Sequence, residues 1–420
     1  MKRKHIEQMA KELVGIAKCA ITDFQALESP HKIISSEGIA FALTGQTVTT
    51  YNELVRRLLN IAKLGEKYSE KSLELRLNSI IASFLGNSDA QSVKTGLNEL
   101  FQDFEDLATE VTVYVPVFGL SVPEPCAFGR VLFRVVDEST LDNLVSSVSE
   151  VITQTRNTEP EKTMISERMT KSITENLRGT VCSTYKVVAE PQRARELAEI
   201  ETRRAFDLLR FAVPFLYRGS ENIRIGLLGE ITRKRTVSLA YSGSNYSLFH
   251  HLVGPVETLA LTPSNIDRMA QIGVLALSDI LKKDEATHTE YERVILRSVH
   301  WIAGATVQTE NENTFLNLMT SLETLLTPRD SSPIGTAIAE GVALLLGKTL
   351  EQRKHIKQRI KHFYGQRGGV SHGGEKAILE SECWELRQYA TLLISALVKR
   401  VDDFKNHRDL FDWLENKKLG

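Results

Sequence analysis

The spacing of apolar residues constrains this 420-residue chain more than any other feature, because the spacing changes twice along it. Up to about residue 106, and again after residue 262, apolar residues recur every three or four positions, as on one face of an α-helix. Between these stretches, Val111, Val113 and Val115 alternate with Thr112 and Tyr114, which is the spacing of a half-buried strand. We therefore expect an α+β protein that is mainly α, long enough for two or three domains.

The two changes of spacing divide the chain into three regions. Residues 1–106 are expected to be helical throughout. Residues 107–262 are expected to form a mixed α/β module with a long helix at 191–216 and strands at 109–116, 130–136, 180–188, 223–228, 236–240 and 256–261. Residues 263–420 are expected to be helical again, starting at a cap near Pro263 and continuing at 291–304, 312–326, 334–346, 350–364 and 377–404. The short connections between these last helices predict antiparallel neighbours in a bundle.

The overall charge and the cysteines exclude several classes of protein. Lys and Arg total 52 against 53 for Asp and Glu, so no general field draws the molecule to nucleic acid or to an anionic membrane. The four cysteines lie far apart and form no C-x-x-C pair, so we expect neither a zinc site nor a disulfide framework, and no metal or cofactor. The longest apolar run, 342–346, is far shorter than the roughly 20 residues that span a bilayer. The first residues include early acidic positions where a signal peptide needs an apolar core, so we expect a cytoplasmic protein without membrane insertion.

One segment departs strongly from the neutral average. From Lys348 to Lys376 the chain has eight basic residues and only two acidic ones, Glu351 and Glu375. Such a patch attracts phosphates whatever the base sequence, which indicates a footprint for nucleic acid. The alternative is a solvated helix face with no ligand.

Inside this patch an arginine, Arg367, is followed five positions later by a histidine, His372. On an unbroken helix, residues five apart point roughly 140° away from each other and could not work on one phosphate. Gly368 and Gly369 are poor helix residues that relax the backbone, so the sequence predicts a bend that brings the two side chains to one side.

An arginine and a histidine that converge in a basic cleft suit the cleavage of RNA without a metal. A neutral imidazole can take the proton from a ribose 2′-hydroxyl, and a protonated one can give a proton to the leaving 5′-oxygen. The guanidinium remains charged and stabilises the negative charge that develops on the phosphate. One such pair offers a single histidine for two proton transfers, and a homodimer about a two-fold axis would supply a second one.

Around these residues the sequence resembles the HEPN superfamily, and within it the Apea-like HEPN group. The resemblance rests on an apolar helix with an acidic centre at Glu323, a small-residue helix through Ala339 and Ala343, and then Arg367 and His372. It covers about residues 312–404 of the helical region. Two positions depart from the family pattern, because Gly368 follows the arginine where a polar residue is common, and Gly341 stands where a basic residue is frequent.

The resemblance implies a dimerising helical domain that acts as a metal-independent endoribonuclease and leaves a 2′,3′-cyclic phosphate. Arg367 and His372 would be the catalytic pair, and Glu323 would orient the arginine. Many relatives are toxins or cut RNA in phage defence, so residues 1–262 are assigned to sensing a trigger or holding an inhibitor. We further expect RNA to contact Lys354, Lys357, Lys361 and Tyr364, the last by stacking on a base.

Four alternatives stay open at this point. Arg367 could be a helix-end arginine that bonds carbonyl groups, and His372 a cap beside Gly373. The HEPN module could be catalytically inactive and serve in dimerisation, RNA binding or protein interaction. Glu323 could be a core carboxylate paired with a neighbouring helix, since buried charges need partners. Tyr364 could pack against the bundle rather than stack on a base.

Overall fold

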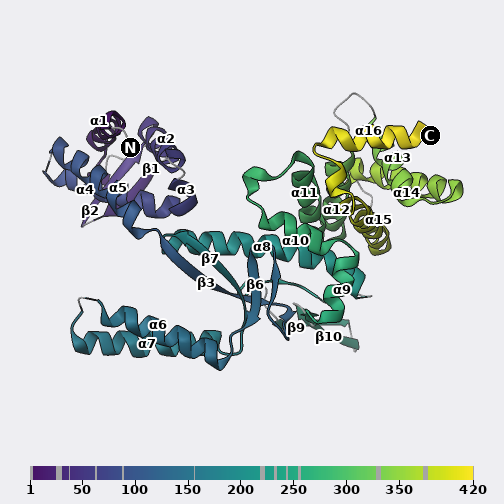
Figure 1. Ribbon diagram of the computed structural model, residues 1–420, viewed down its shortest axis with the longest axis horizontal. Helices are drawn as coiled ribbons and strands as arrows, with labels where there is room; N and C mark the ends of the chain where they lie inside the picture. The colour runs from purple at the N-terminus through teal and green to yellow at the C-terminus, as the bar shows by residue number, and fades with distance from the viewer. Residues whose placement is uncertain are drawn as a thin grey trace. The chain divides into compact units, whose positions relative to one another are not determined.

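The chain folds mainly into helices, with a smaller set of strands in its middle region (Figure 1). The computed structural model describes residues 3–24, 31–36, 38–61, 64–87, 89–155, 157–217, 223–230, 234–242, 245–253, 257–327, 333–371 and 377–419. The α+β class, mainly α, that the apolar spacing predicts is confirmed. Two compact units are present, one made of Met1–Val113 with Lys186–Glu199 and the other of Tyr114–Tyr185 with Ile200–Gly420. The division into three regions stays a prediction.

The first unit packs helices around a β-hairpin. Its elements before the central strands are α1 (Arg3–Lys18), β1 (His31–Ser36), β2 (Ile39–Thr44), α2 (Gln46–Asn60), α3 (Leu64–Lys67), α4 (Glu70–Asn87) and α5 (Ala90–Leu107). The core takes fully buried leucines from four of the helices, namely Leu13, Leu54, Leu77 and Leu97.

The expectation that residues 1–106 are helical throughout is wrong at this hairpin. The two strands pair antiparallel, with Ser36 opposite Ile39 beside the turn. Buried side chains in β2 are consecutive, at Phe41, Ala42 and Leu43, and both α2 and α4 contact this strand. A strand buried in this way shows no period of two, so alternation could not reveal it.

The second unit contains a five-stranded sheet in the order β5-β6-β7-β3-β8. Its strands are β3 (Thr109–Phe118), β5 (Cys126–Phe128), β6 (Val131–Val135), β7 (Val181–Ala189) and β8 (Gly226–Leu227), and the first residues of β3 and the last of β7 extend into the first unit. The long helix α8 (Pro191–Leu216), which the sequence predicts residue for residue, covers one face of the sheet. There the Phe206 ring stacks on Phe133 with centroids 6.1 Å apart, and the hydroxyls of Ser183 and Thr202 lie 2.6 Å apart.

Smaller elements extend the central region. They are β4 (Leu120–Ser121) paired with β11 (Leu259–Ala260), β9 (Lys234–Ser242) paired with β10 (Asn245–Val253), and a helical hairpin of α6 (Glu138–Thr153) and α7 (Glu159–Leu177). The strands predicted at 223–228 and 256–261 shrink to the two-residue strands β8 and β11. The sequence patterns missed β10, α6 and α7. Helix α7 has no buried residue, so it shows only a weak apolar stripe.

The C-terminal helices surround one central helix, α12. They are α9 (Pro263–Gln271), α10 (Val274–Lys282), α11 (Glu290–Ala305), α12 (Asn311–Leu326), α13 (Ile334–Leu346), α14 (Leu350–Ser371), α15 (Glu380–Val398) and α16 (His407–Leu419). Helix α12 packs against α11, α13, α14 and α15. Buried hydroxyls of Ser298 and Ser321, 2.6 Å apart, join α11 to α12, and the rings of Phe315 and Phe363 meet edge-on between α12 and α14.

Helix α14 is longer than predicted. The sequence predicts a helix that ends near residue 364 and a bend at the following glycines, whereas α14 continues through Gly365, Gly368 and Gly369 to Ser371. The helix is held by buried residues on its inner side, among them Phe363 and Gln366. This packing outweighs the roughly 1 kcal/mol by which each glycine disfavours a helix relative to alanine. The prediction of a bend at Gly368 and Gly369 is therefore wrong.

Among the described residues, no helix combines the length and the apolar character that crossing a membrane requires.

Candidate functional site

Arg367 and Glu323 meet where α14 crosses the last turns of α12. The Nη2 atom of Arg367 donates to Oε2 of Glu323 at 3.0 Å, and its Nε atom lies 2.5 Å from Oε1. The carboxylate therefore faces one edge of the guanidinium with both oxygens, the geometry that fixes the plane of an arginine best. The Arg367 side chain keeps 36% of its surface exposed while Glu323 keeps 18%, so a solute can reach the guanidinium although its partner is largely covered.

Packing on both helices places this ion pair. Leu322, Leu325 and Leu326 are buried in the bundle, which leaves Glu323 on the side of α12 that faces α14. Leu326 also packs on Gly341 of α13, where an added Cβ would lie 3.1 Å from the two leucine methyl groups. The position at which the HEPN pattern often has a basic residue is thus filled here by close helix packing.

The second residue of the predicted catalytic pair, His372, lies outside the described residues. The last described residue before it is Ser371, which is still helical in its backbone. Because α14 has no bend at Gly368 and Gly369, these glycines do not by themselves turn the chain back toward Arg367. The structure thus brings together Arg367 and Glu323, and leaves the meeting of Arg367 and His372 as a prediction.

Much of the basic segment is engaged within the bundle. Nζ of Lys357 donates to Glu340 of α13 at 2.7 Å, and Lys418 of α16 binds the other oxygen of the same carboxylate at 2.7 Å. These hydrogen bonds lower the pKa of Glu340, with that from Lys357 as the largest cause. Lys354 and Lys361 are exposed on the outer side of α14. Of the lysines predicted to bind RNA, these two therefore remain at the surface, while the half-exposed Lys357 is paired with Glu340.

Tyr364 packs against the bundle. An added Cβ at Gly335 of α13 would lie 2.3 Å from a ring carbon of Tyr364, so the ring rests directly on that glycine. The tyrosine is half-buried. This contact favours the packing role over base stacking.

Two carboxylates of α15 that sequence reasoning did not single out neutralise further basic residues of α14. Arg359 donates two hydrogen bonds of 2.9 Å and 2.6 Å to Glu385, and these bonds lower the pKa of the Glu385 carboxyl. Glu382 accepts from Gln366 at 3.0 Å and lies 3.1 Å from Nε2 of His362. Burial raises the pKa of Glu382, but hydrogen bonds from the backbone of Leu379, from Gln366 and from His362 outweigh it and lower that pKa.

A signal for these pairs was present in the sequence. Glu382 and Glu385 are three residues apart, as are Arg359 and His362, so each pair occupies one helix face. Two such faces of opposite charge on neighbouring antiparallel helices predict a line of ion pairs. Within the part of the chain that the structure describes, no group of three or more His, Cys, Asp or Glu side chains could hold a metal ion.

Comparisons with models of protein families, with curated proteins and with solved structures found no match.

Proposed function

We propose that this chain is a metal-independent endoribonuclease of the HEPN type that acts as a homodimer. The proposal rests on one observation, the two-oxygen contact of Glu323 on α12 with Arg367 on α14. The family resemblance assigns this role to an acidic residue at this position. The order of helices around the pair also agrees with the resemblance.

In this proposal Arg367 binds the scissile phosphate. Its charge is permanent, and Glu323 holds the guanidinium in one orientation so that little reorganisation is needed as negative charge develops on the phosphate. A neutral His372 takes the proton from the 2′-hydroxyl, whose oxygen attacks the phosphorus and displaces the 5′-oxygen. The product ends in a 2′,3′-cyclic phosphate, and a histidine of the second chain protonates the leaving 5′-oxygen.

A flanking part of the strand, rather than the scissile phosphate, suits the outer side of α14, which faces away from Arg367 at about 100° per residue. Lys354, Lys361 and Gly365 are exposed on it, and an added Cβ at Gly365 would have no heavy atom within 4 Å. The two lysines supply positive charge, and the glycine beside them has no side chain that would keep phosphates at a distance. The regions before residue 263 would sense a trigger or restrain the enzyme.

Cleavage of RNA in EDTA tests the proposal. We expect the purified chain to cut mixed RNAs into fragments with 2′,3′-cyclic phosphate ends, and to leave the matching DNA intact because it lacks the 2′-hydroxyl. Arg367→Ala and His372→Ala should each lower the rate by about 10²–10⁴-fold, the usual contribution of a charge-stabilising or proton-transferring group. Arg408→Ala is the control, since Arg408 is exposed on α16 and lies 3.8 Å from its partner Asp412.

Cleavage that is the same in wild type, Arg367→Ala and His372→Ala would remove this site from consideration. Cleavage that EDTA abolishes would contradict the metal-independent mechanism.

The second candidate is an inactive HEPN module that binds RNA. It is favoured by the unbroken path of α14 through Gly368 and Gly369, which separates Arg367 from the following residues along a helix. In that case RNA binds without being cut, and exchanging both exposed lysines for alanine in Lys354→Ala/Lys361→Ala weakens binding and its dependence on salt.

A further inference from the structure

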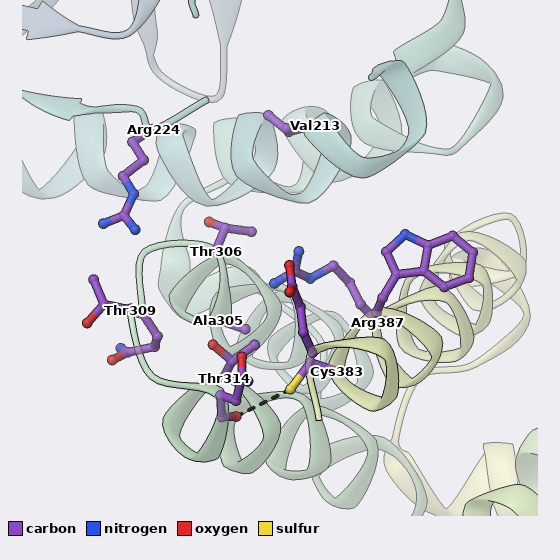
Figure 2. A pocket seen from close by; sticks show the side chains of 12 residues that line it. Val213, Arg224, Ala305, Thr306, Thr309, Thr314, Cys383 and Arg387 are labelled. Carbon is purple, nitrogen blue, oxygen red and sulfur yellow. Dashed lines mark hydrogen bonds between the residues drawn. The ribbon is translucent and has the colours of Figure 1, made fainter. Parts of the chain in front are cut away.

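The second unit contains a pocket at the N-terminal end of α12, the end opposite to the Arg367–Glu323 pair. The cavity measures about 470 Å³, which is within the range of small-molecule sites. It is enclosed by α8, by the segment that carries Arg224, by the end of α11 and the loop after it, and by the first turns of α12 and α15. Figure 2 shows Arg224 and Thr309 on one side of this space, Arg387 and Cys383 on the other, and Thr306 between them.

The pocket is built for an anion. Two arginines line it, Arg224 and Arg387, against one acidic side chain, the exposed Glu380. The first turn of α12 borders it at Asn311 and Thr314, and the N-cap side chain of Glu310 makes no capping hydrogen bond, so backbone N–H groups of this turn add to the two cations while Glu312 in the same turn opposes them. Cys383 brings no negative charge, because burial raises the pKa of its thiol to about 11 and its Sγ donates to the carbonyl of Asn311.

The side chain of Arg224 starts from a rigid piece of backbone. Gly119, at φ +82°, approaches so closely that an added Cβ would lie 2.0 Å from the carbonyl oxygen of Arg224. From the other side, Arg210 donates to the carbonyl of Ile225 through Nε at 3.1 Å and Nη2 at 2.6 Å. A cation on such a fixed support is pre-organised for a ligand.

The exposed Trp384 side chain favours a ligand that carries a flat ring next to its anionic group. Trp384 lines the pocket one turn from Glu380, and 58% of its surface is exposed, which is unusual for so large an apolar side chain. An exposed indole next to arginines offers a stacking platform for a ring whose substituent is charged.

We propose that this pocket binds a small molecule in which a phosphate group is attached to a ring-bearing body. The phosphate lies between Arg224, Arg387 and the first turn of α12, and the ring packs on Trp384. A phosphate is favoured over a carboxylate because its three terminal oxygens and its charge of about −1.5 to −2 can meet both arginines and the first turn of α12 together. Thr314 and Glu323 are nine residues apart on α12, roughly 14 Å, so this site is separate from the proposed nuclease site.

Calorimetric titration of the full chain in a phosphate-free buffer tests the proposal. The probes are inorganic phosphate, ribose 5-phosphate, phenyl phosphate and adenosine 5′-monophosphate. We expect the two aromatic phosphates to bind at least about tenfold more tightly than inorganic phosphate, because only they can stack on Trp384. The comparison of phenyl phosphate with the nucleotide then shows whether a simple ring suffices or a nucleoside is preferred.

Variants of the lining residues test the binding of the phosphate and of the ring separately. Arg224→Gln and Arg387→Gln should weaken every phosphate about tenfold or more, Trp384→Ala should weaken only the aromatic phosphates, and Glu380→Gln should strengthen all of them by removing the opposing charge that lines the pocket. Arg408→Gln and Leu392→Ala are the controls, since both residues are exposed and neither lines the pocket. Circular dichroism and the midpoint of thermal unfolding confirm that each variant is folded.

Several results would overturn the proposal. They are a wild-type chain that binds none of the probes at millimolar concentration, Arg224→Gln and Arg387→Gln both binding as Arg408→Gln does, and Trp384→Ala binding phenyl phosphate as tightly as wild type. Binding confined to oligoribonucleotides would assign the pocket to RNA and overturn it as well. None of these measurements involves cleavage, so their outcome is independent of the proposed nuclease.

Discussion

Arg367 shows how much the position of one charged side chain depends on its partner. Glu323 contacts it with both oxygens from a neighbouring helix, and the two residues are 44 positions apart in the chain. In a second pair on the same helix, Arg359 is also contacted by both carboxylate oxygens of Glu385, here through two hydrogen bonds, but this pair lies two turns away from Arg367. The two pairs therefore allow the positioning of a proposed catalytic group to be compared with ordinary structural pairing.

Removing the charge of Glu323 separates these two roles. In Glu323→Gln we expect kcat for RNA cleavage to fall by about 10–100-fold with little change in KM, because a misplaced guanidinium no longer meets the charge that develops on the phosphate. The matched variant Glu385→Gln should leave kcat within about twofold of wild type. Steady-state kinetics on one defined RNA measure both, and equal losses in the two variants would contradict a positioning role for Glu323.

At the scale of the element, α14 combines a tightly packed inner side with an outer side that carries glycines. The inner side buries Ile360 and Phe363, and the Tyr364 ring rests on Gly335 of the neighbouring α13. Gly365 on the outer side is exposed and would have open space around an added Cβ. The same exchange of glycine for alanine therefore has opposite consequences at these two positions.

We expect Gly365→Ala to raise the free energy of unfolding by up to about 1 kcal/mol, since alanine favours a helix over glycine and meets no neighbour. Gly335→Ala should lower it by about 1–3 kcal/mol, because its methyl group collides with the Tyr364 ring. Urea denaturation of both variants checks the two signs. A loss of stability in Gly365→Ala would show that the outer side of α14 is covered in solution.

On the scale of the whole molecule, side-chain contacts join helices that are distant in sequence within the second unit. His300 of α11 is one of them, because its Nδ1 lies 2.8 Å from Oδ2 of Asp207 on α8. The hydrogen bond to Asp207 raises the pKa of His300, although burial and the nearby Arg210 oppose this rise. The contact therefore couples the packing of the bundle against α8 to protonation.

The sign of the pH dependence follows from this shift. A pKa that is higher in the folded chain than the value of about 6.5 expected after unfolding stabilises the fold fully below pH 6.5, and the stabilisation is lost as pH rises through the folded value. The difference in unfolding free energy between wild type and His300→Gln should thus be larger at pH 5.5 than at pH 8.5, as measured in urea. When His300→Gln is combined with Asp207→Asn, its effect on the unfolding free energy should be the same at pH 5.5 and at pH 8.5. A pH-independent difference in the wild-type background would contradict the pairing.

The amino-acid order alone was enough for the features that arise from local periodicity. Helix α8 and helix α13 have the predicted bounds, and the strands around Val113 and Phe133 lie where alternation indicated them. The family resemblance and the basic segment also single out Glu323, Arg367 and Tyr364 on the C-terminal helices. These features are readable because a helix or half-buried strand repeats its pattern over several turns or residue pairs.

Long-range packing decided the remainder. It buried β2 on more than one side and so removed its alternation, and it carried α14 through three glycines that local preference alone would make its end. It also paired Lys357 and Arg359 with acidic residues of neighbouring helices, and it gathered Arg224 and Arg387, 163 positions apart, around one cavity. No local pattern contains such information, because the energy of a contact depends on which distant segment arrives beside it.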